Sequence, residues 1–187
     1  MQGYRAITLG VTGASGSIIG QKILELLRAQ EGVRVECIFS RAGAAVWEHE
    51  LGVGLPTEDE VLCIHGDDAL FAPVASGSHP SEGMIIAPCS MGTLGKIAHG
   101  LADTLLTRAA GVCLKEGRRL VLVPRESPLT AIHLENMQRL AAAGAVIMPP
   151  MMTFYHGADS VEGMVGEFAH HVLERFGLPS NRWQWGG

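Results

Sequence analysis

The chain has 187 residues, of which 47% are hydrophobic, and its formal net charge is −5. These values suit one globular domain over residues 1–187 with a sizeable core. Because basic blocks are absent and aromatic residues make up only 5%, nucleic-acid binding is not expected. No apolar run reaches the roughly 20 residues of a membrane-spanning helix, and the first strand leaves no room for a signal peptide. We therefore expect a cytoplasmic protein without a membrane partner.

Apolar runs rich in β-branched residues alternate with helical patterns along the chain. In chain order, the pattern predicts a strand at 6–11, a helix at 17–30, a strand at 33–39, a helix at 42–51, a short strand at 61–65, a strand at 84–88, helical segments between 92 and 115, a strand at 119–124, a helix at 129–143, a strand at 145–148 and a last helix that begins at Asp159 with a D-x-x-E capping box. This alternation is typical of βαβ units and predicts a doubly wound parallel sheet of the α/β class.

The turn after the first strand reads Thr-Gly-Ala-Ser-Gly at 12–16. Glycines let the backbone pass close to a ligand, and the free amides of the helix that follows favour a phosphate. Ser15 adds a hydroxyl. The alternative is a tight turn that binds nothing. Neither a complete dinucleotide fingerprint nor a P-loop lysine is present, so ATP chemistry of that class is not expected.

The strand at 84–88 is expected to stop at Pro88, and small polar residues follow it. Ser90, Gly92 and Thr93 then offer hydroxyls and close backbone approach. In an open parallel sheet, ligands bind where strands end and helices begin. The sequence therefore predicts a ligand site at this strand end.

Two further strand ends carry polar side chains. Ser40 follows the strand at 33–39, where it is either a third ligand-binding hydroxyl or a helix cap. Arg125 and Glu126 follow the strand at 119–124 directly. Glu126 is either a simple ion-pair partner of Arg125 or a general acid/base.

The segment 104–126 is basic within an acidic protein. Its cations are Arg108, Lys115, Arg118, Arg119 and Arg125. Such a cluster can hold an anionic substrate such as a phosphate ester, although most charge runs are solvated helix faces. Arg118 and Arg119, which precede a strand, are assigned to the solvated class.

The cysteines have no metal-ligand spacing, and no metal is expected. Each lies in or beside an apolar run, which predicts buried free thiols in a reducing compartment. They are Cys37, Cys63, Cys89 and Cys113.

Several ordered segments resemble the flavin prenyltransferase family of the UbiX type, formerly described as aromatic acid decarboxylases. They are TGASG at 12–16, APCSMGTLGKIAHGLADTLLTRAA at 87–110, LKE at 114–116, VLVPRESPL at 121–129 and PPMMTFY at 149–155, together with Ser40 and Glu50. The matching segments cover nearly the whole chain. The resemblance implies a Rossmann-like three-layer sandwich of the flavoprotein type, with a six-stranded parallel sheet of order 3-2-1-4-5-6, in a homododecamer.

The resemblance also implies a reaction. Enzymes of this family transfer a dimethylallyl group from dimethylallyl phosphate to N5 and C6 of reduced FMN without a metal. The product, prenylated FMN, serves a UbiD-type decarboxylase as cofactor. The tail at 178–187 is expected to pack on a neighbouring subunit.

Matched position by position, the family implies three sets of site residues. The flavin-binding set is Gly13, Ala14, Ser15, Ser40, Ser90, Met91, Gly92, Thr93 and Arg125. The set that binds the prenyl phosphate is Arg108, Lys115, Arg125, Tyr155 and His171. The residues implied in proton transfer are Ser15, Glu50 and Glu126.

The sequence departs from the family in three places. His171 stands where a basic residue is usual, and Arg175, one helical turn later, could replace it. The segment after Tyr155 lacks the usual proline and arginine, and Ser127 stands where threonine is usual.

Two alternatives follow from these observations. One is a related FMN-dependent cysteine decarboxylase, with His49 offered as its base. The other is a non-catalytic carrier of prenylated flavin, which the altered segment after Tyr155 suggests.

Overall fold

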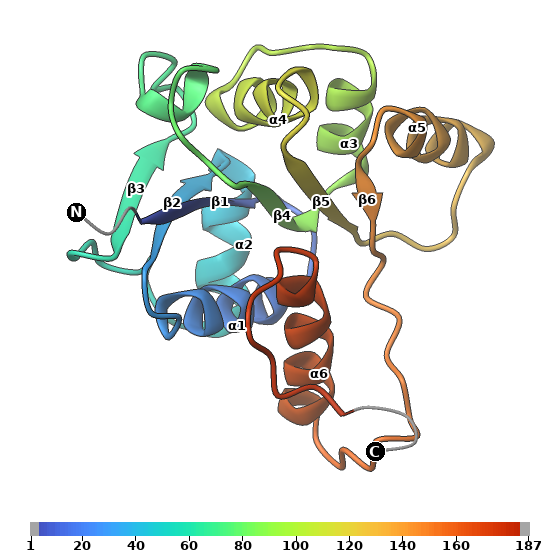
Figure 1. Cartoon of the computed structure of the whole chain (residues 1–187). Coiled ribbons are helices and arrows are strands. Elements are labelled where there is room, and N and C mark those ends of the chain that lie inside the picture. Colours follow the sequence, from blue (N-terminus) through green and yellow to red (C-terminus); the bar gives the residue numbers. More distant parts are fainter. Residues whose placement is uncertain (1–3, 184–187) are drawn as a thin grey trace.

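A computed structural model describes residues 4–183 of the chain, and six parallel strands form one sheet in it (Figure 1). The strands are β1 (Arg5–Val11), β2 (Val33–Phe39), β3 (Leu62–Gly66), β4 (Gly83–Cys89), β5 (Arg119–Pro124) and β6 (Val146–Ile147). The helices are α1 (Ser17–Arg28), α2 (Arg41–Leu51), the 3₁₀ turn η1 (Pro73–Ala75), α3 (Met91–Ala98), α4 (Leu105–Lys115), α5 (Ala131–Ala142) and α6 (Val161–Glu174). The order β3-β2-β1-β4-β5-β6 confirms the expected topology.

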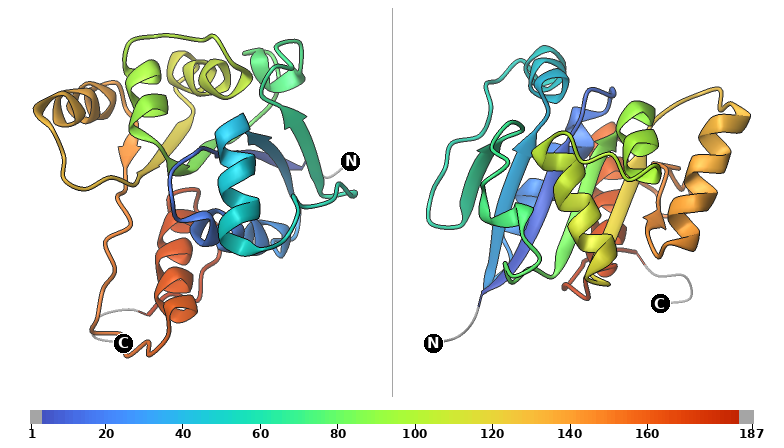
Figure 2. Two further views of the ribbon diagram at one scale, coloured as in Figure 1. Left: turned by 180° about the vertical axis from the view of Figure 1, so that it is seen from behind. Right: turned by 90° about the horizontal axis from the view of Figure 1, so that it is seen from above.

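The helices cover both faces of the sheet, which gives three layers (Figure 2). Helices α1, α2 and α6 lie on one face, and α3, α4 and α5 lie on the other. Successive strand residues point to opposite faces, so neighbouring residues of β4 enter different cores. Ile85 belongs to the same buried cluster as Ile23 of α1 and Phe168 of α6, whereas Ile86 belongs to the cluster that contains Leu106 of α4.

The predicted helices and strands are present, with ends within two residues of the predicted ones. The helical segment predicted between 92 and 115 consists of two helices, α3 and α4, separated by a loop. The cap of α6 is Ser160, whose hydroxyl accepts a hydrogen bond from the Gly163 amide at 3.2 Å. The predicted capping box at Asp159 was therefore wrong, because the serine next to it is the residue that meets the first free amides of the helix.

The expectation that β4 stops at Pro88 was also wrong. The strand continues to Cys89, and its pairing with β5 is irregular between Ile86 and Cys89. Proline has no amide hydrogen, and an irregular stretch of the ladder can hold it without losing a hydrogen bond. One cysteine also differs from expectation: Cys63 is exposed, because it lies on the edge strand β3.

Helix α1 passes very close to β4 at Gly20. A Cβ atom at this position would lie 2.5 Å from the carbonyl oxygen of Ala87, which belongs to the backbone and cannot swing aside. We expect Gly20→Ala to lower the free energy of unfolding by about 1–3 kcal/mol, the usual cost of overpacking. Urea denaturation at neutral pH measures it.

Gly111 is the matched control, since it lies inside α4 and a Cβ there meets no atom within 4 Å. Gly111→Ala should leave stability unchanged or raise it by up to about 1 kcal/mol through helix propensity. Equal effects of the two substitutions would contradict the close packing of α1 on β4.

Candidate functional site

The carboxyl ends of three central strands are joined by hydrogen bonds at one edge of the sheet. The buried hydroxyl of Thr12, just after β1, donates to the Pro88 carbonyl at 2.8 Å and accepts from the Ser90 amide at 2.7 Å. The Arg125 amide, just after β5, donates to the Cys89 carbonyl at 3.2 Å. The polar strand ends predicted from the sequence therefore lie side by side.

The glycine turn lies against this edge. The Arg125 side chain donates through Nε to the Ser15 carbonyl at 3.1 Å, which connects the end of β5 to the start of α1. Gly13 and Ser15 are exposed, whereas Ala14 is buried. Glu126 is exposed beside them and accepts from the Ser127 amide at 3.0 Å. Within residues 4–183, no ion pair joins Arg125 to Glu126.

The Glu50 carboxylate, at the end of α2, occupies the amino terminus of α1. It accepts from the Gly16 amide at 2.9 Å and from the Ser17 amide at 2.8 Å. The sequence analysis predicted that these amides would favour a phosphate. In the structure, the Glu50 carboxylate accepts their hydrogen bonds instead. Burial raises the pKa of Glu50, but hydrogen bonds from the Ser15 side chain and the two amides outweigh it and hold the pKa below its ordinary value.

A cavity of about 250 Å³ lies where the amino termini of three other helices converge. Ser40 caps α2 by accepting from the Gly43 amide at 3.0 Å, and Ser90 caps α3 by accepting from the Thr93 amide at 3.2 Å. Helix amino termini carry a partial positive charge and attract anions. The cavity is lined by Ser40, Asp67, Gly92, Thr93, Lys96, Thr104, Leu106 and Thr107.

Four polar residues of this cavity were missed in the sequence: Asp67, Lys96, Thr104 and Thr107. Thr104 and Thr107 form a capping box at the start of α4, a Thr-x-x-Thr signal that was readable. Asp67 accepts from the Leu106 amide at 2.9 Å across 39 residues of sequence, so no local pattern indicated it. Lys96 pairs with Asp103 at 2.7 Å.

The residues expected to bind a prenyl phosphate are not gathered at one place in a single chain. Arg108 and Lys115 lie on α4, where Arg108 donates to the Ala75 carbonyl at 3.2 Å and Lys115 pairs with Glu116. His171 lies on α6, on the other face of the sheet. Arg125 alone of this set lies at the strand edge described above.

Tyr155 and His171 lie near the C-terminal end of the described chain. The ring of Tyr155 packs on Trp183, with ring centroids 5.0 Å apart. His171 lines a small cavity together with Arg182, a residue that the sequence reading did not single out. Residues 184–187, which belong to the expected subunit-packing tail, lie outside the described residues.

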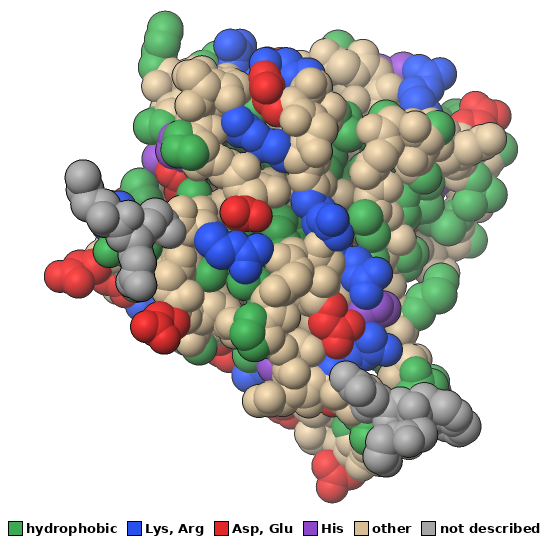
Figure 3. Space-filling view, viewed as in Figure 1, with side chains coloured by type: hydrophobic (Ala, Val, Ile, Leu, Met, Phe, Trp, Pro, Cys, Tyr) green, Lys and Arg blue, Asp and Glu red, His purple; other side chains and the backbone are tan. Residues whose placement is uncertain are grey.

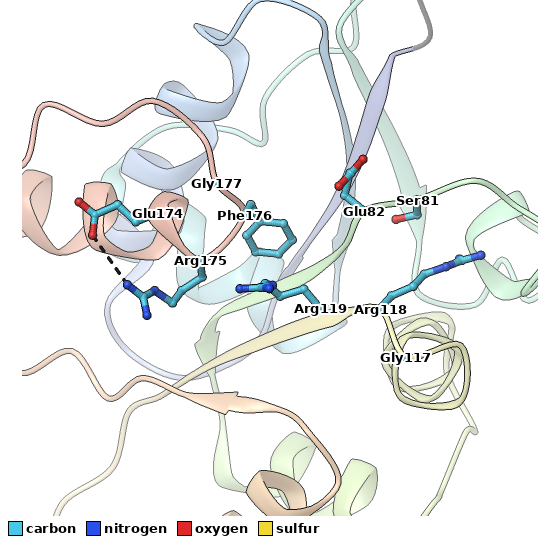
Figure 4. Close-up of a pocket in the computed structure, with 9 residues that line it drawn as sticks. All are labelled: Ser81, Glu82, Gly117, Arg118, Arg119, Glu174, Arg175, Phe176 and Gly177. Carbon is cyan, nitrogen blue, oxygen red and sulfur yellow. Dashed lines mark ion pairs between the residues drawn. The ribbon is translucent and has the colours of Figure 1, made fainter.

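Within residues 4–183, His171 forms no ion pair, although Glu167 and Arg175 lie one helical turn away from it, in α6 and at its C-cap. Burial lowers its pKa, and the positive charges of Arg182 and Arg175 lower it further, so the imidazole is neutral near pH 7. Arg175 does not line the His171 cavity. Its side chain points instead toward Glu174 (Figure 4).

None of the helices in residues 4–183 is both long and apolar enough to cross a bilayer. Among the same residues, no group of three or more His, Cys, Asp or Glu side chains is placed to hold a metal ion.

Comparison with known proteins gives consistent results. A family model described as Flavoprotein matches residues 1–172. The chain is 43% identical to "Flavin prenyltransferase UbiX" of Methanothermobacter thermautotrophicus over 188 residues, which covers 98% of this chain and 97% of that protein.

Solved structures agree with this similarity. A crystal structure of AnUbiX (PadA1) in complex with FMN and dimethylallyl pyrophosphate matches with a TM-score of 0.94 and 39% identity, over 98% of both chains. A dodecameric FMN-dependent Ubix-like decarboxylase from Escherichia coli O157:H7 matches with a TM-score of 0.88 and 40% identity, over 96% of this chain and 98% of that chain.

The contact between Glu50 and α1 predicts a pH dependence of stability. The pKa of Glu50 in the folded chain lies below its ordinary value of 4.5, so its contribution is present above that value and is lost as the pH falls through the lowered pKa. We expect Glu50→Gln to lower the melting temperature at pH 7, and the difference from the unsubstituted protein to shrink progressively as the pH falls below 4.5.

Thermal unfolding at a series of pH values measures this difference. Glu48→Gln, which changes an exposed carboxylate on the same helix, is the control and should follow the unsubstituted protein throughout. A constant gap between Glu50→Gln and the unsubstituted protein at every pH would contradict the assignment.

Proposed function

The chain belongs to the flavin prenyltransferases of the UbiX type, and we propose that it transfers a dimethylallyl group from dimethylallyl phosphate to N5 and C6 of reduced FMN. The observation that carries this proposal is the single sheet edge at which the ends of β1, β4 and β5 meet beside three helix amino termini. In parallel sheets, such an edge is where flavins and nucleotides bind.

The residues at this edge fit FMN. Its phosphate is a dianion, and the cavity lined by Ser40, Thr93 and Thr107 offers hydroxyls, helix amino termini and the ammonium group of Lys96. We assign the phosphate to this cavity and not to the amino terminus of α1, which Glu50 fills. The Ser90–Thr93 turn and the glycine turn then border the rest of the flavin.

The isoalloxazine ring supplies the nucleophilic N5 and C6 atoms when FMN is bound. Around it, Arg125 and Glu126 stand at the end of β5, and Ser15 and Glu50 stand at the start of α1. We assign Glu126, with Ser15 as its relay, to proton transfer at the departing phosphate, and Glu50 to proton transfer at the ring. Both carboxylates lie within a region already connected by the Arg125 contact with Ser15.

The prenyl-phosphate site requires more than one copy of the chain in this proposal. Arg108 and Lys115 on α4 and His171 on α6 lie on opposite faces of one sheet, so one copy does not bring them together. A neighbouring copy supplies the α4 cations. Support comes from the dodecameric assembly of the Escherichia coli relative, and the tail at 178–187 is assigned to the same boundary.

His171 contributes to phosphate binding as a neutral hydrogen-bond donor in this proposal. Its lowered pKa leaves little positive charge at neutral pH. Arg182, which lines the same cavity, is the permanent cation there, a role for which the sequence had offered Arg175 as one possibility.

The product is prenylated FMN, and we propose that it passes to a UbiD-type decarboxylase in the cytoplasm. Family membership leaves the cysteine-decarboxylase alternative without support. The carrier alternative shares the flavin site with the enzyme, so only turnover separates the two.

The phosphate assignment can be tested with Thr93→Val, which removes a hydroxyl and keeps the side-chain shape. A hydrogen bond to a charged group contributes about 1.5–3 kcal/mol, so FMN affinity should fall roughly 10- to 100-fold. Quenching of flavin fluorescence measures it. Riboflavin, which lacks the phosphate, is the matched ligand, and its affinity should not change. Equal losses for FMN and riboflavin would place the phosphate elsewhere.

The enzyme and the carrier are separated by Glu126→Gln. If Glu126 transfers a proton, turnover should fall by about 10²- to 10⁴-fold while FMN still binds. The assay is anaerobic incubation with reduced FMN and dimethylallyl phosphate, followed by mass analysis of the flavin. Glu135→Gln, an exposed carboxylate on α5, is the control and should keep full activity.

Two results would count against the proposal. If the flavin never gains a prenyl unit with the monophosphate or the diphosphate donor, the prenyltransferase assignment fails. If the unsubstituted protein binds prenylated FMN tightly but never forms it, the carrier alternative holds.

A further inference from the structure

A second cavity, with a volume of about 650 Å³, lies at the opposite edge of the sheet. It is formed where β4 and β5 begin and where α6 ends, so it faces away from the strand ends that carry the flavin site. Its charged lining residues are Arg118, Arg119, Arg175, Glu82 and Glu174 (Figure 4). Figure 3 shows Lys and Arg side chains over the middle of one face, with acidic side chains among them.

Two of the arginines have unused hydrogen-bond donors. Within residues 4–183, the Arg119 side chain makes no hydrogen bond and no ion pair, and it is exposed to the cavity. The Nε atom of Arg175 is buried and has no acceptor in the same residues. A buried donor without an acceptor is costly, so an incoming anion would gain both charge attraction and an unfilled hydrogen bond.

The acidic residues of the cavity already have other cationic partners. Glu174 accepts from Ser180 and from Arg182, each at 2.9 Å, whereas Arg175 is 3.9 Å away. Glu82 pairs with Arg5 at 3.5 Å. The negative charge in the cavity is therefore largely satisfied without Arg119 and Arg175.

The arrangement of the side chains also favours a ligand. In Figure 4, the Arg119 side chain extends toward Phe176 and the base of Arg175, and the Arg175 guanidinium lies beyond it beside Glu174, whereas Arg118 extends the opposite way. Arg118 donates to the Gly77 carbonyl and is held by that contact. Arg119, at the start of β5, and Arg175, at the end of α6, thus offer two guanidinium groups from different elements.

We propose that this cavity is a second anion site that binds phosphate or a phosphate ester between Arg119 and Arg175. Guanidinium groups present planar pairs of donors that match phosphate oxygens, and they keep their charge at all physiological pH values. The volume lies within the range of small-molecule sites, roughly 300–1,000 Å³. The inference goes beyond prenyl transfer and does not depend on it, because it concerns equilibrium binding at another edge of the sheet.

The experiment is a titration of the FMN-loaded protein with inorganic phosphate, followed by the ³¹P NMR line of phosphate in a phosphate-free buffer. FMN occupies its own phosphate cavity during the titration. We expect Arg119→Gln and Arg175→Gln each to weaken phosphate binding about 10- to 100-fold, as for loss of a hydrogen bond to a charged group. Arg119→Lys keeps the positive charge but removes the planar pair of guanidinium donors, so it should retain part of the phosphate affinity.

Arg139→Gln is the matched control, because it removes an exposed arginine on α5 that lines none of the cavities described above. It should titrate like the unsubstituted protein. If Arg119→Gln also titrates like the unsubstituted protein, phosphate binds only at the prenyl-phosphate site and the proposal is overturned. Should Arg175→Gln unfold, the variant at the exposed Arg119 decides the result, since the Arg119 side chain makes no hydrogen bond or ion pair within residues 4–183.

Discussion

The hydroxyl of Thr12 is the contact on which the carboxyl edge of the sheet depends. The side chain is 1% exposed, so its donor and its acceptor must both be satisfied inside the protein. Pro88 and Ser90 satisfy them, which fixes the end of β4 against the end of β1. Ser90 is also the cap of α3, so the same contact sets where that helix starts. The Ser90–Thr93 turn, which we assign to the flavin, therefore depends on this registration of two strands.

Much of the fold could be predicted because local sequence patterns determine where its helices and strands form. Hydrophobic periodicity located the strands and helices, and the position of polar residues directly after strands located Ser40, Ser90 and Arg125. The two interpretations of Ser40 proved compatible, since its hydroxyl caps α2 and also lines the cavity. What could not be predicted are contacts between distant parts of the chain. Glu50 reaches Gly16 across 34 residues, and no spacing rule connects them.

The two edges of a parallel sheet differ chemically, and this chain uses the difference. Helices that follow parallel strands begin at the carboxyl edge and end at the amino edge, so one edge gathers positive helix ends and the other gathers negative ones. At the carboxyl edge, hydroxyl and glycine residues are enough to attract an anion. At the amino edge, only charged side chains can do so, and Arg119 and Arg175 are placed there. The assignment of Arg119 to a merely solvated surface, natural from its sequence context, did not foresee its position beside α6.

The caps at the three converging helix ends have a consequence for how the protein handles its flavin. Ser40, Ser90 and Thr104 each satisfy an amide of their own helix, so the walls of the cavity that we assign to the FMN phosphate are complete without a ligand. A ligand that arrives adds to contacts that are already made, and a ligand that departs leaves no broken helix behind. A cavity built in this way can be emptied and refilled without refolding of the helices that line it.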